Sequence, residues 1–133
     1  MEQTLIIIKP DGVARGLIGE VIKRFESRGL RIAKLSLMEA QKATVESHYA
    51  EHRERPFFPD VVAYLTSGPI VVMAIEGPNA VVACRSMMGA TNPAEAAPGT
   101  IRGDFAVSLE ENVVHGSADP ESAHRELGIW FPQ

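Results

Sequence analysis

Hydrophobic residues occur along the chain in continuous runs that alternate with helical spacings. Residues 5–8 and 70–75 are continuous apolar runs next to Gly and Pro, which is typical of strands buried on both faces. In residues 30–38 the parity of the apolar positions changes midway, which predicts a strand with a β-bulge. Residues 112–115 predict a short last strand that ends at a histidine. The pattern therefore predicts a sheet of four strands.

Amphipathic helices are predicted between these strands. Residues 17–25 place apolar side chains on one helical face, and Gly29 ends the pattern. Thr44 is a candidate N-cap for a helix that begins one residue later. Pro56 and Pro59 are expected to interrupt the region that follows this helix.

The second half of the chain predicts two further helices and a long loop. Asn79 is a candidate cap for a helix over residues 80–88. Residues 89–103 have little periodicity and much Gly, Pro and Ala, so we expect a loop of a length that is usually functional. Asp119, followed by a proline and an acid, predicts the start of the last helix, and Gly128 is expected to end it before a short tail.

The element order is β-α-β-α-β-α-loop-β-α. It predicts an α+β fold, a ferredoxin-like sandwich with a four-stranded antiparallel sheet, helices and a long inserted loop. We expect the helices to cover the sheet mainly on one side. The length of 133 residues predicts one domain over residues 1–133.

Composition narrows the class of protein. The chain is 45% hydrophobic and 23% charged with a net charge of −4, and its basic residues are scattered. That pattern argues against a nucleic-acid interface, which usually carries a basic stripe. The single cysteine, Cys84, is expected to be buried and inert, and it indicates a reducing compartment. Without a signal-peptide pattern or an apolar run of membrane length, we expect a cytoplasmic protein with no membrane partner.

The strongest candidate for chemistry is His115, which ends the last strand where a helix is about to begin. Positive partial charge at a helix N-terminus favours the uncharged, nucleophilic ring and attracts anions. Gly116 lets another molecule approach, Ser117 adds a hydroxyl, and Glu126 is placed to accept a ring N–H. A histidine that only hydrogen-bonds at a strand end explains these residues equally well.

Phosphate-binding side chains form a second group of candidates, although no P-loop or dinucleotide motif is present. Lys9 closes an apolar strand, Arg85 lies in an apolar helical segment, and Arg102 lies in the long loop. Arginine binds phosphate through a planar fork of donors, and lysine binds it as a point charge. Thr91 and Asn112 can add neutral hydrogen bonds. Taken singly, each of these basic residues is better explained as a solvated side chain at the end of an element.

The aromatic residues and the remaining histidines are weaker candidates. Tyr49 and Phe57 can offer a ring face to a base, although core packing is the commoner fate of such residues. His48, His52 and His124 stand on helices among charged residues and are expected to be solvated. Their spacing does not require a metal.

Several long stretches together resemble the nucleoside diphosphate kinase family. They are TLIIIKPDGV, HYAEHRERPFF, TNPAEAAPGTIRGDFA, NVVHGS and LGIWFP, and they span almost the whole chain in order. The resemblance implies an enzyme that transfers the γ-phosphoryl group from nucleoside triphosphates to nucleoside diphosphates by a ping-pong mechanism through a phosphohistidine. Such a reaction asks the protein mainly for placement and charge stabilisation.

The resemblance also implies roles for individual residues. His115 is the residue phosphorylated, on Nδ1, while Glu126 holds Nε2 and Ser117 and Tyr49 lie near the transferred group. The implied nucleotide-binding residues are Lys9, Phe57, Arg85, Thr91, Arg102 and Asn112. Within this set Phe57 stacks on the base, with Val61 and Leu109 as apolar neighbours, and Asn112 and Lys9 contact the ribose. Mg²⁺ is the implied cofactor, held by the phosphates and water rather than by protein ligands.

One position departs from the family pattern. The family commonly continues HGS with Asp-Ser, whereas this chain has Ala118-Asp119. We expect the acid at 119 to keep the helix cap and the chemistry to stay intact, with a modest effect on stability or assembly. The resemblance further implies a homo-oligomer built from dimers, either a tetramer or a hexamer, with the loop around Pro93 at the hexamer contact.

Two other classes of function remain as alternatives. An RNA-binding ferredoxin-like module requires exposed aromatic residues on the middle strands and a basic surface. These strands instead read LIIIK and IVVMAI, and the net charge is negative. A catalytically silent relative that only binds nucleotide would lack the histidine or a phosphate arginine, and all of them are present.

Overall fold

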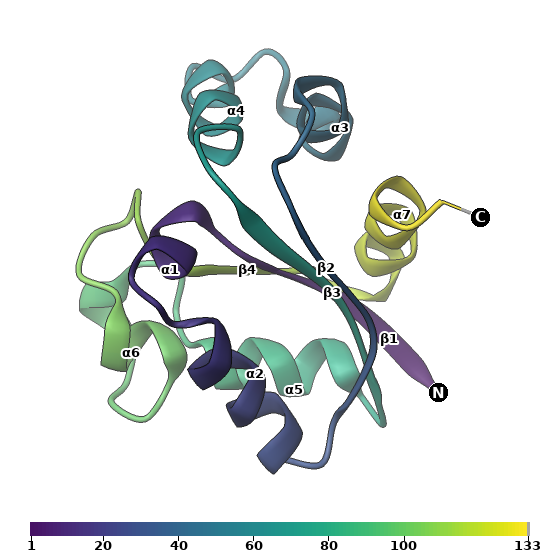
Figure 1. Ribbon diagram of the computed structural model, residues 1–133, viewed down its shortest axis with the longest axis vertical. Coiled ribbons are helices and arrows are strands. Elements are labelled where there is room, and N and C mark those ends of the chain that lie inside the picture. The colour runs from purple at the N-terminus through teal and green to yellow at the C-terminus, as the bar shows by residue number, and fades with distance from the viewer. Residues whose placement is uncertain (133) are drawn as a thin grey trace.

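A four-stranded sheet in the order β2-β3-β1-β4 runs through the centre of the computed structural model, which describes residues 1–132 (Figure 1). The strands are β1 (Glu2–Ile8), β2 (Arg31–Met38), β3 (Ile70–Gly77) and β4 (Val114–Gly116). Every neighbouring pair is antiparallel. This order confirms the predicted ferredoxin-like α+β fold.

Seven helices and two short 3-10 turns surround the sheet in the described part of the chain. The helices are α1 (Pro10–Ala14), α2 (Ile18–Ser27), α3 (Lys42–His48), α4 (Phe58–Leu65), α5 (Ala80–Met88), α6 (Ile101–Phe105) and α7 (Pro120–Trp130). The 3-10 turns are η1 (Ala50–His52) and η2 (Pro93–Glu95). None of the helices within residues 1–132 is both long and apolar enough to cross a membrane.

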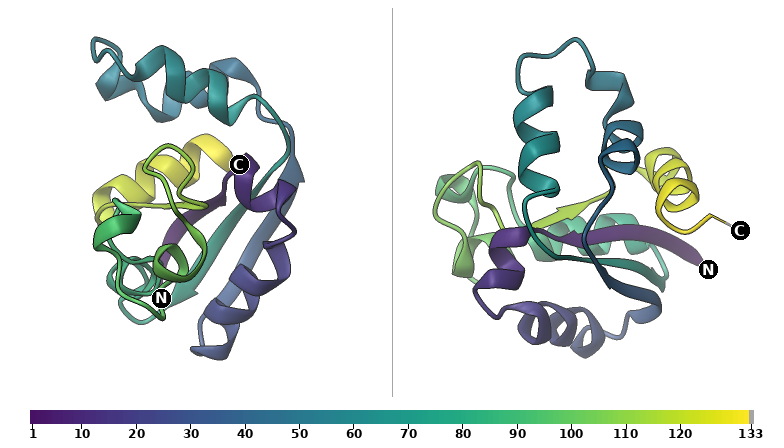
Figure 2. Two further views of the ribbon diagram at one scale, coloured as in Figure 1. Left: turned by 90° about the vertical axis from the view of Figure 1, so that its left-hand side faces the viewer. Right: turned by 45° about the horizontal axis from the view of Figure 1, so that its top comes forward.

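The helices cover both faces of the sheet, so the expectation of one-sided cover is wrong. Helices α2 and α5 lie on one face, and α3, α4 and α7 lie on the other (Figures 1 and 2). The reason is visible in β1, where Ile6 and Ile8 join the core under α2 and α5 while Leu5 and Ile7 join the core under α3, α4 and α7. A strand that is apolar on both sides needs a cover on both sides. This double cover leaves no open aromatic platform on β1 or β3 of the kind that RNA-binding modules use.

Strand β2 is an edge strand, and it carries the predicted bulge. The pairing with β3 shifts between Ile32 and Lys34. Beyond the bulge, Leu35 and Leu37 remain exposed on the surface. Among the described residues the outer edge of β2 has no partner strand, and two exposed leucines lie on this strand.

Several predicted boundaries are displaced. Helix α3 begins at Lys42 with Gln41 at the N-cap position, so Thr44 is not the cap. Pro59 stands in the first turn of α4, where proline is tolerated because its missing N–H would have no partner there. This proline marks the start of a helix that the sequence reading missed. Helix α7 continues through Gly128 to Trp130 because its last residues pack under the sheet.

The segment predicted as a long loop is partly helical. After α5 the chain forms η2 and then α6, so Arg102 lies on a helix. Thr100 caps α6 by accepting a hydrogen bond from the Gly103 N–H at 3.0 Å. Asn79 does occupy the N-cap position of α5, but the capping acceptor is Glu2, which takes the N–H of Val81 at 2.8 Å.

Candidate active site

His115 lies in the middle of β4, opposite Ile7 of β1. Its ring is near the rings of His48 on α3 and Tyr49, with centroid separations of 4.7 Å and 6.4 Å. The side chain retains 19% of its accessible surface, so the ring is held by neighbours and still reachable from solvent.

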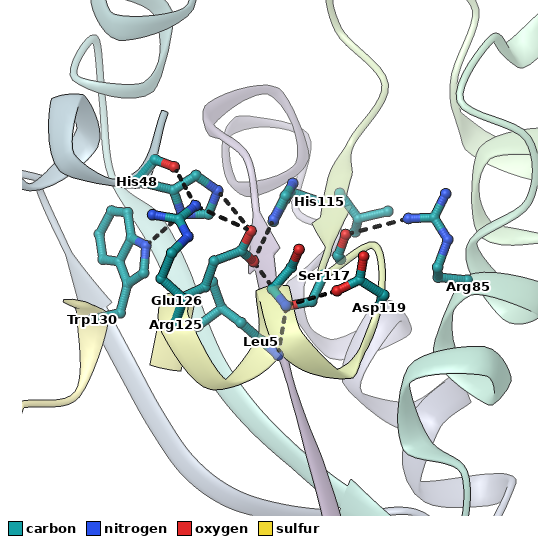
Figure 3. Close-up of polar contacts among 12 residues, drawn as sticks. Leu5, His48, Arg85, His115, Ser117, Asp119, Arg125, Glu126 and Trp130 are labelled. Atoms are coloured by element: carbon teal, nitrogen blue, oxygen red, sulfur yellow. Dashed lines mark hydrogen bonds and ion pairs between the residues drawn. The ribbon is translucent and has the colours of Figure 1, made fainter. Parts of the chain in front are cut away.

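Glu126 on α7 holds one edge of this ring. Its Oε1 lies 3.2 Å from His115 Nε2 and accepts a hydrogen bond of 2.8 Å from Ser117 Oγ (Figure 3). Burial alone raises the pKa of Glu126, but the hydrogen bond from His115 and the other nearby donors outweigh it and lower that pKa overall. An ionised Glu126 accepts hydrogen bonds from its neighbours, which places the ring proton of His115 on Nε2. Within residues 1–132 no side chain or backbone group hydrogen-bonds Nδ1, so this nitrogen keeps its lone pair.

Ser117 stands behind the ring rather than in the pocket. It is fully buried, and its Oγ accepts a 3.3 Å hydrogen bond from the Leu5 N–H while donating to Glu126. The serine therefore fastens the Glu126 carboxylate to the backbone of β1.

The prediction that His48 is solvated is wrong. His48 is 2% exposed, and its Nδ1 accepts a 2.8 Å hydrogen bond from the indole N–H of Trp130. Its Nε2 faces the second carboxylate oxygen of Glu126 at 3.6 Å (Figure 3). Burial, together with the nearby His115, lowers the pKa of His48 to about 3, so this ring stays uncharged. Sequence reading missed it because its partner Trp130 lies at the far end of the chain.

The cluster of His48, His115 and Glu126 has the composition of a metal site, with ligand atoms within 4.8 Å of one another. The hydrogen bonds argue against that use. Because His48 Nδ1 accepts from Trp130, the proton of this uncharged ring is on Nε2, the atom that a metal would need. The cluster is better explained as a set of donors around one carboxylate.

A pocket of about 230 Å³ opens beside His115. It gathers residues from distant parts of the chain, and the predicted site residues that line it are Lys9, Tyr49, Arg85, Thr91, Arg102, Asn112, His115 and Glu126. Lysine and arginine side chains supply positive charge, and the Glu126 carboxylate is already engaged by His115 and Ser117. Such a pocket favours an anion.

Lys9 follows the end of β1 and points to the Asn112 side chain, to which its Nζ donates a hydrogen bond of 2.7 Å. Asn112 in turn donates to the Thr91 carbonyl at 3.0 Å. Burial and the charge of Arg102 lower the pKa of Lys9 to about 8, against a smaller opposing effect of Asp11. The lowered pKa means that the charged form of Lys9 is disfavoured in this pocket. A bound anion stabilises that charged form, so the site favours an anion.

Arg102 is held by the backbone beneath the pocket. Its guanidinium donates to the carbonyls of Gly89 and Val114 at 2.8 and 2.9 Å, and its buried Nε has no hydrogen-bond partner within residues 1–132. Burial and the neighbouring Arg85 lower the pKa of Arg102 to about 10. Two guanidinium groups that disfavour each other are stabilised by an anion between them.

Of the remaining predicted residues, Tyr49 lines the pocket and three others lie outside its lining. Burial raises the pKa of Tyr49, so its hydroxyl stays protonated beside His115. Phe57 is 44% exposed at the start of α4 and lies outside the pocket lining, with its ring 5.5 Å from that of His52. Val61 and Leu109 also lie outside the lining. The structure therefore joins the phosphate-type residues to His115 and leaves the aromatic candidate on the adjacent surface.

The predictions for two residues that follow His115 in the sequence had different outcomes. Gly116 was expected to make room for a ligand, but a Cβ at this position would lie 2.3 Å from the Met88 side chain, so the glycine makes room for the core. Asp119 caps α7 as predicted, accepting the Ser122 N–H at 2.7 Å.

An imidazole with one free ring nitrogen, fixed by a carboxylate and facing a cationic pocket, defines a group-transfer site for phosphorylated substrates. Comparison with known proteins agrees. The sequence model described as "Nucleoside diphosphate kinase" matches residues 2–133. The chain is 58% identical to a nucleoside diphosphate kinase of Thermus thermophilus over 131 residues, which cover 98% of this chain and 96% of that one. It is 55% identical to the corresponding protein of Archaeoglobus fulgidus, with 98% and 87% covered.

Solved structures give the same result. A crystal structure of a nucleoside diphosphate kinase family protein from Babesia bovis has a TM-score of 0.97 and 46% identity, covering 99% of this chain and 89% of that one. The apo enzyme from Encephalitozoon cuniculi has a TM-score of 0.97 and 40% identity, covering 100% and 90%. The chain belongs to the nucleoside diphosphate kinase family. It is a phosphotransferase of this type, which moves the γ-phosphoryl group between nucleotides by a ping-pong reaction through a phosphohistidine.

Proposed function

We propose that His115 carries the phosphoryl group, on Nδ1, during this reaction. The observation that supports the assignment is the contact between His115 Nε2 and Glu126 Oε1 at 3.2 Å, which leaves Nδ1 as the free nitrogen. A nucleophile held by a partner that is itself fixed by a third group is the usual arrangement for covalent catalysis. Here Ser117 is that third group.

The proposed reaction has two mirrored halves. The lone pair of Nδ1 attacks the γ-phosphorus of a nucleoside triphosphate, an N–P bond forms, and the bond from phosphorus to the bridging oxygen breaks. The departing diphosphate takes that electron pair, and the ring keeps its Nε2 proton toward Glu126. A second nucleoside diphosphate then attacks the phosphohistidine through its terminal phosphate oxygen, which returns the ring to its starting state.

The pocket residues supply placement and charge for both halves. We assign the phosphates to Lys9, Arg85, Thr91 and Arg102, and the ribose to Asn112 together with Lys9. The 2.7 Å contact between Lys9 and Asn112 supports their joint use. Tyr49 is assigned to the side of the transferred phosphoryl group, where its protonated hydroxyl can donate a hydrogen bond.

The base is assigned to the exposed ring of Phe57 outside the pocket, with Val61 and Leu109 beside it. Stacking on an aromatic face depends little on which base is present, because every base has a π-face. Broad tolerance of bases follows from that mode of binding. No nucleic acid is required as a partner.

Mg²⁺ is proposed to enter with the nucleotide. Among the described residues, the carboxylates that line the pocket are those of Glu51 and Glu126, and the oxygens of Glu126 face His115, Ser117 and His48. This chain therefore offers Mg²⁺ little direct ligation. The ion fits the site as part of the substrate, coordinated by phosphate oxygens and water, which is its usual preference.

The oligomeric state, the cellular compartment and the domain organisation are also proposals. The exposed Leu35 and Leu37 on the unpaired edge of β2 support a homo-oligomer built from dimers, as a tetramer or a hexamer. The lone cysteine, Cys84, is buried and has no second cysteine with which to form an internal disulfide, which suits a protein of the cytoplasm. The match over residues 2–133 supports a single domain.

Intact mass measured after mixing with Mg-ATP, without an acceptor, tests the assignment. The wild type is expected to gain one acid-labile phosphoryl group and to lose it when a nucleoside diphosphate is added, whereas the His115→Asn variant gains none. If His115→Asn still gains the phosphoryl group, His115 is not the phosphorylated residue. Binding of nucleotide with no gain of mass in either protein would identify a catalytically silent relative.

A further inference from the structure

A strained turn immediately precedes the catalytic strand. Val113 has a φ of 73°, and it is one of two non-glycine residues with positive φ among residues 1–132. The N–H of Val114 donates to the carbonyl of Asn112 at 2.8 Å, which closes a three-residue γ-turn around Val113. This form of the γ-turn is rare, and a β-branched residue is disfavoured in it. Neighbouring groups must therefore hold the turn.

The carboxylate of Asp11 on α1 is one of these groups. Its Oδ2 accepts the N–H of Val113 at 3.1 Å, while the Val113 carbonyl accepts the N–H of Lys9 at 2.8 Å. Both polar groups of the strained residue are thus bound by the segment that follows β1. Asp11 is 7% exposed, so water competes little for these contacts.

The other oxygen of Asp11 is bound by α4. Tyr64 donates its hydroxyl to Asp11 Oδ1, and the N–H of Asp11 donates back to the Tyr64 oxygen at 3.1 Å. Burial and the neighbouring Asp11 raise the pKa of Tyr64, so the hydroxyl remains a donor. Phe57 immediately precedes the first residue of this same helix, α4.

The turn determines where two site residues point. Asn112, on one side of Val113, binds Lys9 and Thr91, and Val114, on the other side, receives Arg102 and leads into His115. A relaxed Val113 with negative φ would rotate these neighbours relative to one another. The groups assigned to ribose, phosphate and phosphoryl transfer all depend on this geometry.

We infer that Asp11 is a positioning residue for phosphoryl transfer, which holds the γ-turn at Val113 in its strained form and, through Tyr64, ties that turn to α4. This inference rests on the proposed function of His115. Asp11 contacts none of the reacting atoms and acts through Asn112 and His115. A purely structural role would instead affect stability and activity together.

The decisive experiment compares Asp11→Ala, Val113→Gly and the double variant by the single-turnover rate of phosphorylation from Mg-ATP and by melting temperature. Asp11→Ala is expected to slow phosphorylation by about 100-fold, the effect of misplacing reacting groups by about 1 Å. Glycine adopts positive φ without a side-chain penalty, so the double variant is expected to recover at least about tenfold in rate. It should nevertheless melt at a lower temperature, because it loses a fully buried valine side chain. Val113→Gly alone is the control and should phosphorylate at close to the wild-type rate.

Recovery of rate together with a loss of stability supports the inference, because a structural role predicts that the second substitution lowers both. A double variant no faster than Asp11→Ala overturns it. Tyr64→Phe, which keeps the size of the side chain, covers the case in which Asp11→Ala does not fold, and an unchanged rate there would remove the link to α4. A crystal structure of the folded variant adds a readout independent of activity. If Val113 keeps its positive φ in Asp11→Ala, the inference is overturned. This outcome does not depend on whether His115 is the phosphorylated residue.

Discussion

At the scale of single residues, the site is organised around one carboxylate. Glu126 receives His115 and Ser117 on one oxygen and faces His48 on the other. His48 cannot take a proton easily because it is buried, and its Nδ1 already accepts from Trp130. His48 therefore stays uncharged beside Glu126 at neutral pH.

The buried His48 should make stability depend on pH. Its pKa is about 3 in the folded protein against 6.5 for an ordinary histidine, so the unfolded chain takes up the proton first as the pH falls. The free energy of unfolding is therefore expected to decrease below pH 6.5, by about 2 kcal/mol at pH 5, and to go on falling toward pH 3. Urea unfolding of the wild type and of His48→Gln at several pH values measures this, and the variant should have a flatter profile. His124→Gln removes an exposed imidazole from α7 and serves as the control; equal slopes in all three proteins would contradict the prediction.

Lys9 should limit activity at alkaline pH. Its pKa of about 8 in the free protein means that it loses its charge above this pH and binds phosphate less well. We expect kcat/KM to fall above about pH 8, and kcat to fall less, because bound nucleotide restores the charge. In Lys9→Arg the guanidinium stays charged, so the falling limb of kcat/KM near pH 8 should disappear. If kcat/KM falls near pH 8 in both proteins, another group causes the fall.

At the scale of elements, short helices place the cationic side chains. Helix α6 has only five residues, yet it presents Arg102 to the carbonyls of Gly89 and Val114. It depends on the Thr100 cap and on the close approach of Gly103 to the preceding turn. A short helix of this kind is stable only through such local contacts.

Substitution of Gly103 tests this dependence. A Cβ at this position would lie 2.0 Å from the Ala97 carbonyl oxygen, which is backbone and cannot swing away. Gly103→Ala is expected to lower stability by about 1–3 kcal/mol and to reduce activity by displacing Arg102. Gly128 lies within α7 with no atom near its missing side chain, so Gly128→Ala should raise stability by up to about 1 kcal/mol. Thermal unfolding compares the two, and changes of the same sign would contradict the argument.

At the scale of the whole molecule, the sheet has two edge strands with different surroundings. Strand β4 lies at one edge beside the site, and β2 forms the other edge with Leu35 and Leu37 exposed. Unpaired apolar edges are normally covered, since they otherwise favour uncontrolled pairing with other chains. Self-association through β2 would leave the pocket accessible, because the pocket residues lie away from this strand.

Charge placed on this edge should separate the subunits of the proposed oligomer. Leu35→Lys combined with Leu37→Lys is expected to lower the mass measured by light scattering to that of a smaller assembly or a single chain. Val82 on α5 and Val107 after the end of α6 are also exposed and lie away from β2 in the sequence, so lysine at these positions is the control. An unchanged mass in the β2 variant would place the contact elsewhere.

The sequence alone determined the four strands, the bulge in β2, the last helix cap at Asp119 and many of the residues that line the pocket, although it missed His48. These features are local, or they are carried by contiguous motifs such as NVVHGS. Hydrophobic periodicity and turn chemistry act over a few residues, so they can be read without knowing the fold.

Only the tertiary structure decided the rest. It brought Trp130 to His48 and His48 to Glu126, and it bound Asp11 to both Val113 and Tyr64. It also put helices on both faces of the sheet and left Phe57 outside the pocket lining. The physical reason is that the burial of a polar group, and so its pKa and its hydrogen-bond partners, depends on chain segments that meet only after folding. A sequence names the side chains, and packing determines which of them face one another.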